Sequence, residues 1–148
     1  MRVMVMVKAT KNSEDGIMPS PELLANMSSF NQELITAGVM LAGDGLKPSA
    51  QGKRIRFGGG AKTVVDGPFT ETKELIAGFT MIQVGSRQEA LDWIRRWPAR
   101  DAGGNVELEL RQVFEAEDFG AEFTPELRAT EERLRAEVDQ RASGATKR

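Results

Sequence analysis

Apolar and polar residues alternate with a period of two in several short segments, which is the pattern of β-strands. In residues 3–7 valines alternate with methionines, so both faces of this segment are apolar and we expect it in the centre of a sheet. The triple glycine at residues 58–60 separates two further segments and predicts a β-hairpin. The predicted strands are 1–8, 39–46, 54–57, 62–65, 76–84 and 106–112.

Two segments between these strands carry apolar residues at helical spacing, and the first of them has Leu23, Met27, Phe30 and Leu34 on one face. Ser20 is a good N-cap for the first helix, and Gly38 can end it in the left-handed conformation. Ser86 and Glu89 predict a capping box at the start of the second helix, which Pro98 ends. Its apolar side is expected to comprise Ala90, Leu91, Ile94 and Trp97. The segment around Asp15 and Gly16 is interpreted as a polar loop.

The order of elements is strand, helix, several strands, helix, strand. This order predicts an α+β fold, a ferredoxin-like unit with an added β-hairpin, over residues 1–114. The methionines are assigned to its core more readily than to a pliable lining for a small ligand.

Residues 115–148 differ in composition from the rest, with nine acidic and six basic residues. Thr124 and Pro125 predict the start of a C-terminal helix, with ion pairs from Glu131 to Arg135 and from Glu137 to Arg141. Its apolar stripe is thin and suits docking along a groove, on its own subunit or across a dimer: Leu127, Leu134 and Val138. We expect residues 142–148 to be frayed.

Composition excludes several kinds of chemistry. The 148 residues contain no cysteine, histidine or tyrosine, so thiol nucleophiles, Ser-His-Asp triads and the usual zinc and haem sites are excluded. A net charge of −2 without a basic stripe argues against nucleic-acid and anionic-membrane surfaces. The first residues lack the features of a secretion signal, and no stretch is apolar for the length of a membrane span. We therefore expect a cytoplasmic protein without cofactor or metal.

A specific resemblance rests on two motifs, Asp-Gly-Pro-Phe-Thr-Glu-Thr-Lys-Glu at residues 66–74 and Ala-Gly-Asp-Gly-Leu at residues 42–46. With the strand–helix opening, they resemble the DGPF branch of the YCII-related domain family over residues 1 to about 114. The resemblance implies a ferredoxin-like unit that pairs its sheets into a dimeric α/β barrel, and hence a homodimer. Most such proteins have no assigned role, and several are encoded beside sigma factors of the extracytoplasmic-function type.

The family resemblance does not extend to the catalytic dyad proposed for YCII proteins. In YCII proteins more generally, a histidine on the first helix and an aspartate elsewhere have been proposed as a dyad. This chain has no histidine, and Met27 stands at the corresponding position by rough alignment. The dyad chemistry is therefore not carried over.

The Asp-Gly-Pro-Phe motif has a structural and a functional interpretation. In the structural one, which we favour, Asp66 accepts hydrogen bonds from nearby backbone amides and Phe69 fills the core. In the functional one, the turn presents four side chains at the mouth of a cleft, where they hold an anionic or carbonyl group. These candidates are Asp66, Thr70, Glu71 and Lys73.

Two further residues are candidates for the same cleft. Asp44 lies between two glycines at a strand end, and Lys8 ends the first strand. If Asp44 faced Asp66 in a dry pocket, one carboxyl would have a raised pKa and serve as an acid near neutrality. A hydrogen-bonded turn at Asp44 and a solvent-exposed Lys8 are the plainer expectations.

Two functional hypotheses follow. The first is a dimeric ligand- or partner-binding module, linked by the family resemblance to a sigma factor. The second is a cofactor-free small-molecule enzyme of the isomerase, cyclase or monooxygenase type with a carboxylate as general base, by analogy with similar barrels.

Overall fold

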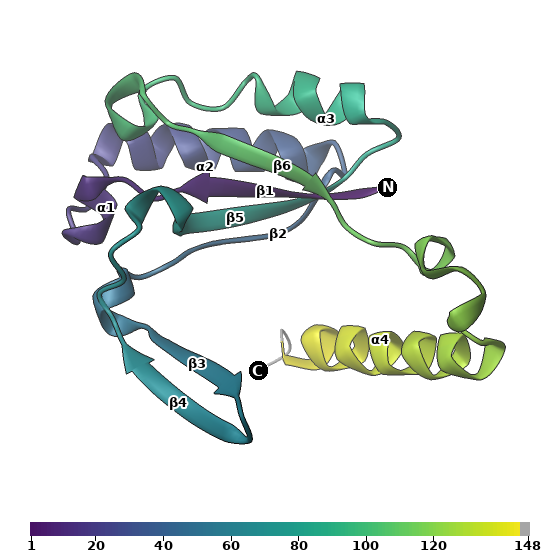
Figure 1. Cartoon of the computed structure of the whole chain (residues 1–148). Coiled ribbons are helices and arrows are strands. Elements are labelled where there is room, and N and C mark those ends of the chain that lie inside the picture. Colours follow the sequence, from purple (N-terminus) through teal and green to yellow (C-terminus); the bar gives the residue numbers. More distant parts are fainter. Residues whose placement is uncertain (146–148) are drawn as a thin grey trace. The chain divides into compact units, whose positions relative to one another are not determined.

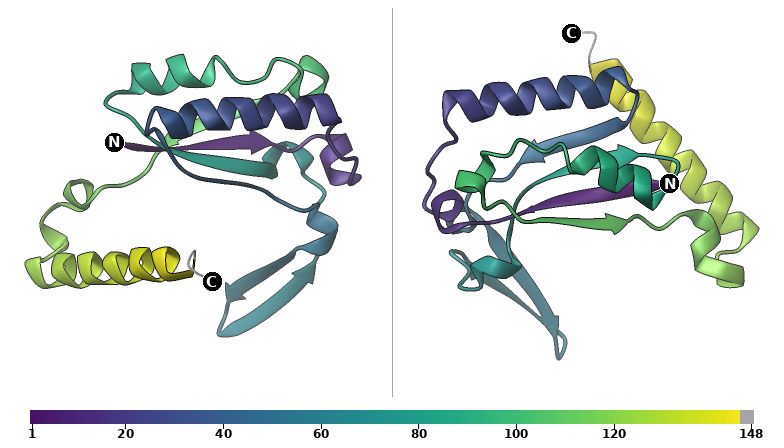
Figure 2. Two further views of the ribbon diagram at one scale, coloured as in Figure 1. Left: turned by 180° about the vertical axis from the view of Figure 1, so that it is seen from behind. Right: turned by 90° about the horizontal axis from the view of Figure 1, so that it is seen from above.

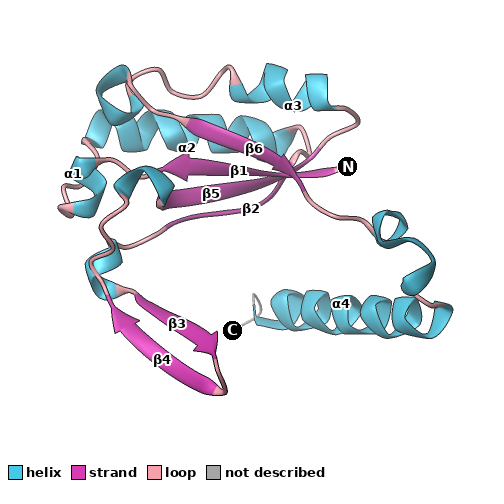
Figure 3. Cartoon of the chain, in the orientation of Figure 1, coloured by secondary structure: helices cyan, strands magenta, loops and turns pink. Residues whose placement is uncertain are grey.

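The computed structural model describes residues 1–145, and for Thr72 and Ala145 it describes the backbone alone. The chain divides into two compact units, Met1–Val113 and Phe114–Arg148. Helices and strands follow one another as shown in Figure 3. They are β1 (Arg2–Lys8), α1 (Lys11–Glu14), α2 (Pro21–Thr36), β2 (Met40–Gly45), η1 (Ser49–Gln51), β3 (Lys53–Gly58), β4 (Ala61–Asp66), η2 (Thr72–Glu74), β5 (Ile76–Gln83), α3 (Arg87–Ile94), η3 (Asp101–Gly104), β6 (Leu108–Gln112), η4 (Ala116–Glu122) and α4 (Pro125–Ala145).

A four-stranded sheet organises the first unit, with the strand order β2-β5-β1-β6. All neighbouring strands are antiparallel, and β1 lies between β5 and β6 as expected from its two apolar faces. The order is that of the predicted ferredoxin-like unit, in which each helix connects two strands that are not neighbours. The predicted mixed fold with antiparallel sheets and a C-terminal helix is confirmed.

Helices α2 and α3 lie on the same face of this sheet (Figures 1 and 2). The core forms between them and the sheet, where Val5, Leu34 and Ile82 are completely buried. The ring of Phe30 meets Trp97 edge to face at 5.7 Å, and the Trp97 indole N–H donates to Asp101 Oδ2 at 2.8 Å. The predicted helical periodicity therefore identifies the face of α2 that packs on the sheet.

Helix ends follow the predicted residues with two differences. Ser20 accepts from the Leu23 amide, and Gly38 has φ +69°. At α3, Ser86 accepts from the Glu89 amide, but the Glu89 carboxylate accepts from the amide of Gly85, so the reciprocal capping box is wrong. The helix ends at Ile94, before Pro98, and Leu91 is exposed because the sheet is on the other side.

Strands β3 and β4 form a separate two-stranded ribbon with Ile55 opposite Val64, as the glycines predicted. Gly59 and Gly60 occupy its turn with positive φ angles of 57° and 78°. The ribbon stands apart from the four-stranded sheet in Figure 1. The segment predicted as a polar loop instead contains the short helix α1, whose N-cap Thr10 accepts from the Ser13 amide.

The second unit consists of η4 and α4. Phe119 packs against Phe114 and Phe123 with ring centroids 5.2 and 5.4 Å apart. Arg128 donates to the Phe123 and Ala116 carbonyls, which fixes the start of α4 against η4.

One of the two ion pairs predicted for α4 needs correction. The Glu131–Arg135 pair is present at 2.9 Å, but Glu137 pairs with Arg133 at 2.7 Å and not with Arg141. The helix is described as far as Ala145 and residues 146–148 lie outside the described part, so the fraying expected for residues 142–148 stays a prediction. No helix within residues 1–145 is both long and apolar enough to cross a membrane.

Candidate functional site

The face of the four-stranded sheet opposite α2 and α3 carries two rows of side chains, which we call the open face. Cross-strand pairing defines both rows because side chains opposite each other in neighbouring strands point the same way. Methionines and Phe79 of the central strands are half-buried in the middle, and polar or small residues of the outer strands are exposed. The rows run Ala42, Met81, Met4, Arg111 and Asp44, Phe79, Met6, Glu109.

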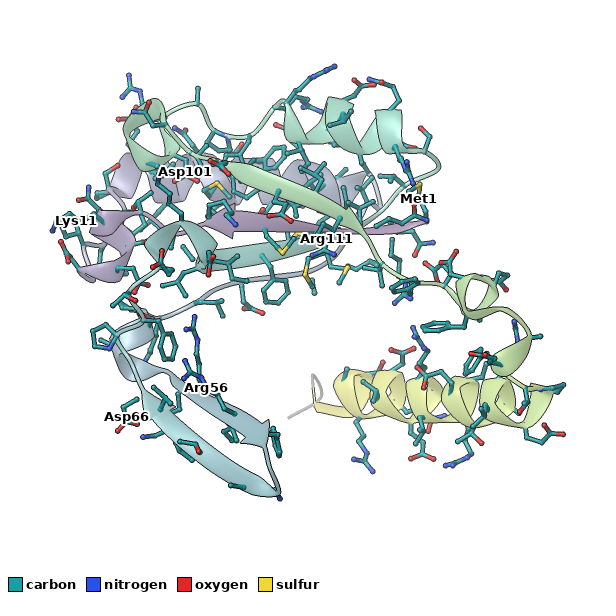
Figure 4. All side chains as sticks on the ribbon, viewed as in Figure 1. Met1, Lys11, Arg56, Asp66, Asp101 and Arg111 are labelled. Carbon is teal, nitrogen blue, oxygen red and sulfur yellow. The ribbon has the colours of Figure 1, made fainter. Side chains whose placement is uncertain are left out.

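Charged groups therefore border an apolar centre on both sides. Figure 4 labels Arg111 on β6. The Lys8 ammonium at the end of β1 lies 3.4 Å from the Glu109 carboxylate, and the Lys8 side chain is only 18% exposed. Lys8 thus stays at the margin of the open face and is more enclosed than the predicted solvent-exposed lysine.

The methionines are divided between two environments. Met27 and Met40 pack against the core, as predicted. Met4, Met6 and Met81 lie on the open face, where no helix of the first unit covers them (Figure 1). Their assignment to the core is therefore wrong for these three.

The Asp-Gly-Pro-Phe motif has a detailed structural role. The Gly67 amide donates to the Gly52 carbonyl at 3.0 Å, and the Gly67–Pro68 peptide is cis. A Cβ on Gly67 would lie 1.8 Å from the Ser49 carbonyl oxygen, so only glycine fits this approach. The motif is thereby fixed against η1.

Ser49 connects the motif to the first part of the chain. Its hydroxyl accepts from the Phe69 amide at 3.0 Å and donates to the Glu14 carboxylate, which also accepts from the Ser49 amide. Phe69 is not in the main core, contrary to prediction, and its ring lies 3.9 Å below the Arg54 guanidinium. The sequence did not indicate a role for Glu14 or Ser49, because their partners are distant in sequence. Ser49 contacts Phe69, which is 20 residues away, and Glu14 contacts Ser49, which is 35 residues away.

The side chain of Asp66 has a different partner from the one predicted. Its carboxylate pairs with the Lys53 ammonium across the hairpin, on which Figure 4 labels it, instead of binding backbone amides of the turn. Asp44 belongs to the other sheet, where it stands opposite Phe79.

Thr70, Glu71 and Lys73 are exposed in the connection from β4 to β5. Lys73 lies in η2, a single short helical turn. The candidates thus fall into three places: the open face with Lys8 and Asp44, the hairpin with Asp66, and this connection.

Sequence reasoning missed Glu109 and Arg111 as possible site residues. Their alternation with Leu108 and Leu110 indicated only a solvated face of the last strand. That face is the continuation of the methionine face of β1, which only the β1–β6 register reveals.

A shallow depression of about 220 Å³ lies on the helix side of the first unit. Glu33 and Arg96 form an ion pair at its wall, and Phe30 and Pro98 also line it. It contains none of the predicted candidates. Among the residues that the structure describes, no group of three or more carboxylate, histidine or cysteine side chains is arranged to hold a metal ion.

Comparisons with known proteins agree with the family resemblance. The YCII-related domain matches residues 1–117. An uncharacterized protein, R00369, from Rhizobium meliloti (strain 1021) is 34% identical over 73 residues, which are 49% of this chain and 59% of the relative. The alignment thus spans less than two thirds of that relative's length.

A solved structure of 5-chloro-2-hydroxyhydroquinone dehydrochlorinase (TftG) from Burkholderia phenoliruptrix AC1100, in complex with 2,5-dihydroxybenzoquinone, is similar at 13% identity with a TM-score of 0.42. It covers 80% of this chain and 98% of the other. The family assignment depends instead on the domain match over residues 1–117. On that match, the chain belongs to the YCII-related domain family.

Proposed function

We propose that this protein, a member of the DGPF branch, is a homodimer whose open faces meet around a space that binds a small, largely apolar organic acid. The observation that carries the proposal is the pair of cross-strand rows on the open face, apolar in the middle and charged at both edges. Such an arrangement is typical of ligand sites, which combine apolar lining with few polar groups.

The dimer follows from the apolar centre of the open face. Met4, Met6, Phe79 and Met81 form one contiguous group on a sheet whose opposite side carries α2 and α3, the long helices of the same unit (Figure 2). Contiguous apolar surface of this kind marks an interaction site, and a second copy offers the same surface for a self-complementary contact. The pairing of two sheets is the dimeric α/β barrel that the resemblance implies.

The ligand class follows from the cations at the edges. Arg111 provides a planar guanidinium suited to a carboxylate, and Lys8 lies beside Glu109 on the same side. In this proposal the apolar body of the ligand lies on Phe79 and the methionines. We place the entrance of this space beside the connection from β4 to β5, where Thr70, Glu71 and Lys73 are exposed, while Asp66 pairs with Lys53 on the hairpin.

Light scattering tests the dimer. We expect a molar mass of twice 16.2 kDa for the wild-type protein. Met4→Lys places a charge in the middle of the open face and should shift the mass towards one chain. Met18→Lys is the matched control, since Met18 is 78% exposed in the loop before α2. A wild-type mass of one chain, or equal effects of both substitutions, contradicts the proposed dimer.

Calorimetric titration with 1-naphthoate tests the ligand class. A charge-assisted hydrogen bond contributes about 1.5–3 kcal/mol, so Arg111→Ala should weaken binding about 10- to 150-fold. Arg95→Ala, at the exposed C-cap of α3, is the control and should leave the affinity unchanged. Failure of the wild-type protein to bind 1-naphthoate, or equal affinities of the two variants, argues against an organic-acid site.

A cofactor-free enzyme is the second candidate, favoured by the position of Asp44. This carboxylate stands opposite Phe79 in the same row as Met6, so it borders the apolar centre and can take a proton from a ligand bound there. Once a converted compound is known, Asp44→Asn should abolish turnover with little change in affinity. Unchanged turnover would exclude Asp44 as the base.

A further inference from the structure

Methionine is concentrated on the open face of the four-stranded sheet. The chain contains seven methionines, and three of them, Met4, Met6 and Met81, belong to the apolar centre of this face. Met4 stands directly opposite Met81 in the pairing of β1 with β5, and Met6 lies two residues further along β1. Side chains at opposite and diagonal positions of neighbouring strands lie within reach of one another. The three thioethers therefore form one group, which we call the methionine cluster.

The two faces of these strands use different kinds of apolar side chain. On the core side the residues are branched, with Val3 opposite Ile82 and Val5 two residues further on, and these three are at most 4% exposed. Valine, isoleucine, leucine and methionine gain similar free energies on burial, and strands favour the branched ones. What methionine adds on the open face is an adaptable shape and a sulfur that can be oxidised.

The sulfur atoms of the cluster lie outside the packed core. Met27 and Met40 pack against the buried residues, whereas Met4, Met6 and Met81 are half-buried on the side of the sheet that faces away from α2 and α3 (Figure 1). A small oxidant can reach a side chain in such a position without any opening of the core. The cluster is therefore partly accessible within its own unit.

We propose that the methionine cluster is an oxidation site, and that its modification by a peroxide separates the two copies of the chain. The thioether sulfur donates an electron pair to one oxygen of hydrogen peroxide, and the O–O bond breaks. The departing hydroxide takes the proton left on the new sulfur-bound oxygen. The products are methionine sulfoxide and water, so the sulfur is oxidised and the peroxide is reduced.

The consequence for assembly rests on the proposed homodimer. A sulfoxide is polar, and a polar group that is buried without a hydrogen-bond partner is costly. Each oxidised chain would bring sulfoxides into the middle of a close apolar contact, so oxidised chains remain single. Methionine sulfoxide reductases reverse the reaction, which makes the cluster a reversible control of assembly.

Treatment with hydrogen peroxide at low protein concentration tests the proposal. The peroxide is then removed, the protein is concentrated, and peptide mass mapping and light scattering are carried out. We expect one added oxygen on each of Met4, Met6 and Met81, and a one-chain mass at a concentration at which the untreated protein has a two-chain mass. Repair with both methionine sulfoxide reductases, one for each sulfoxide epimer, should restore the two-chain mass.

Leucine variants separate the cluster from the other methionines. Leucine and methionine have similar volumes, so a triple variant with Met4→Leu, Met6→Leu and Met81→Leu preserves the apolar contact. It should keep its two-chain mass after peroxide. Met18→Leu is the matched control, since Met18 is 78% exposed in the loop before α2, and this variant should lose the two-chain mass as the wild-type protein does.

Several results would overturn the proposal while leaving the homodimer in place. They are a two-chain mass that persists with oxygen on the cluster, a cluster that stays unoxidised while Met18 is oxidised, and equal loss of the two-chain mass by the triple variant and Met18→Leu. If the triple variant is a single chain before treatment, the repair experiment decides, and a two-chain mass that does not return overturns the proposal. A one-chain mass for the untreated wild-type protein removes the proposed dimer itself.

Discussion

The substitution Gly67→Ala tests whether the Asp-Gly-Pro-Phe motif acts through backbone packing. An added Cβ would lie 1.8 Å from the carbonyl oxygen of Ser49 and 2.6 Å from its carbonyl carbon. Both atoms belong to the backbone, so no side-chain rotation relieves the overlap. To accept the methyl group, the motif must move away from η1, which lengthens the hydrogen bonds from the Gly67 and Phe69 amides.

The expected magnitude follows from the cost of overpacking. Forcing one extra methyl group into a closely packed site costs about 1–3 kcal/mol of the free energy of unfolding. For a chain of this size each kcal/mol lowers the melting temperature by about 2–4 °C, so Gly67→Ala should lower it by about 2–12 °C. Thermal unfolding followed by circular dichroism measures this shift.

Gly58→Ala is the matched control for Gly67→Ala, because a Cβ on Gly58 meets no atom within 4 Å. It lies on the same hairpin and makes the same chemical change. We expect its melting temperature to stay within about 2 °C of the wild-type value, as for surface substitutions of about 0.5 kcal/mol or less. Equal melting temperatures for the two variants would refute the packing argument and return the motif to a functional interpretation.

Three further predictions concern the core and the helix ends. Leu34→Ala removes a completely buried side chain and should lower the free energy of unfolding by about 2–5 kcal/mol in urea denaturation. As the control, Leu24→Ala removes a half-exposed side chain from the same helix and should lower the free energy of unfolding by about 0.5 kcal/mol or less. Ser20→Ala removes the N-cap of α2 and should lower the free energy of unfolding by about 1 kcal/mol in the same assay. Hydrogen bonds from its own backbone N–H and from Thr124 hold the pKa of Glu126 below its ordinary value. The ionised Glu126 therefore stabilises the fold at pH values above the pKa that it has in the unfolded chain. This stabilisation is lost as the pH falls through its pKa in the folded protein. Thr124→Ala should raise the Glu126 titration midpoint in NMR spectra, and an unchanged midpoint contradicts the assignment.

Most of the fold could be predicted because its elements carry local signals. The cap at Ser20, the spacing up to Leu34 and the glycine turn of the hairpin all act within a few residues of one another. Where two amides lay within reach of one side chain, sequence spacing alone did not identify the partner. Glu89 satisfies the amide of Gly85 and not that of Ser86, although both lie within reach of its side chain in sequence.

The candidate site was less predictable because it depends on strand register. Glu109 and Arg111 come onto the same face as Met6 and Met4 only through the pairing of β1 with β6, about 100 residues apart in sequence. A shift of one residue in that register would place leucines there instead. The Ser49 network has the same origin, since its partners Glu14 and Phe69 come from distant segments.

The charges at the edges of the open face constrain how two copies can meet. Burying an ion pair costs several kcal/mol per ion unless hydrogen bonds replace the lost water, so a dry contact over Lys8 and Glu109 would weaken the dimer. At 3.4 Å with one partner 45% exposed, this pair depends on water for much of its solvation. Two open faces can therefore touch closely through the methionines and Phe79, while the charged edges stay solvated. That leaves polar space beside an apolar contact, and an organic acid placed there would bury its carbon skeleton without stripping the ions of polar partners. The same rows of residues thus favour both the proposed dimer and the ligand proposed to bind within it.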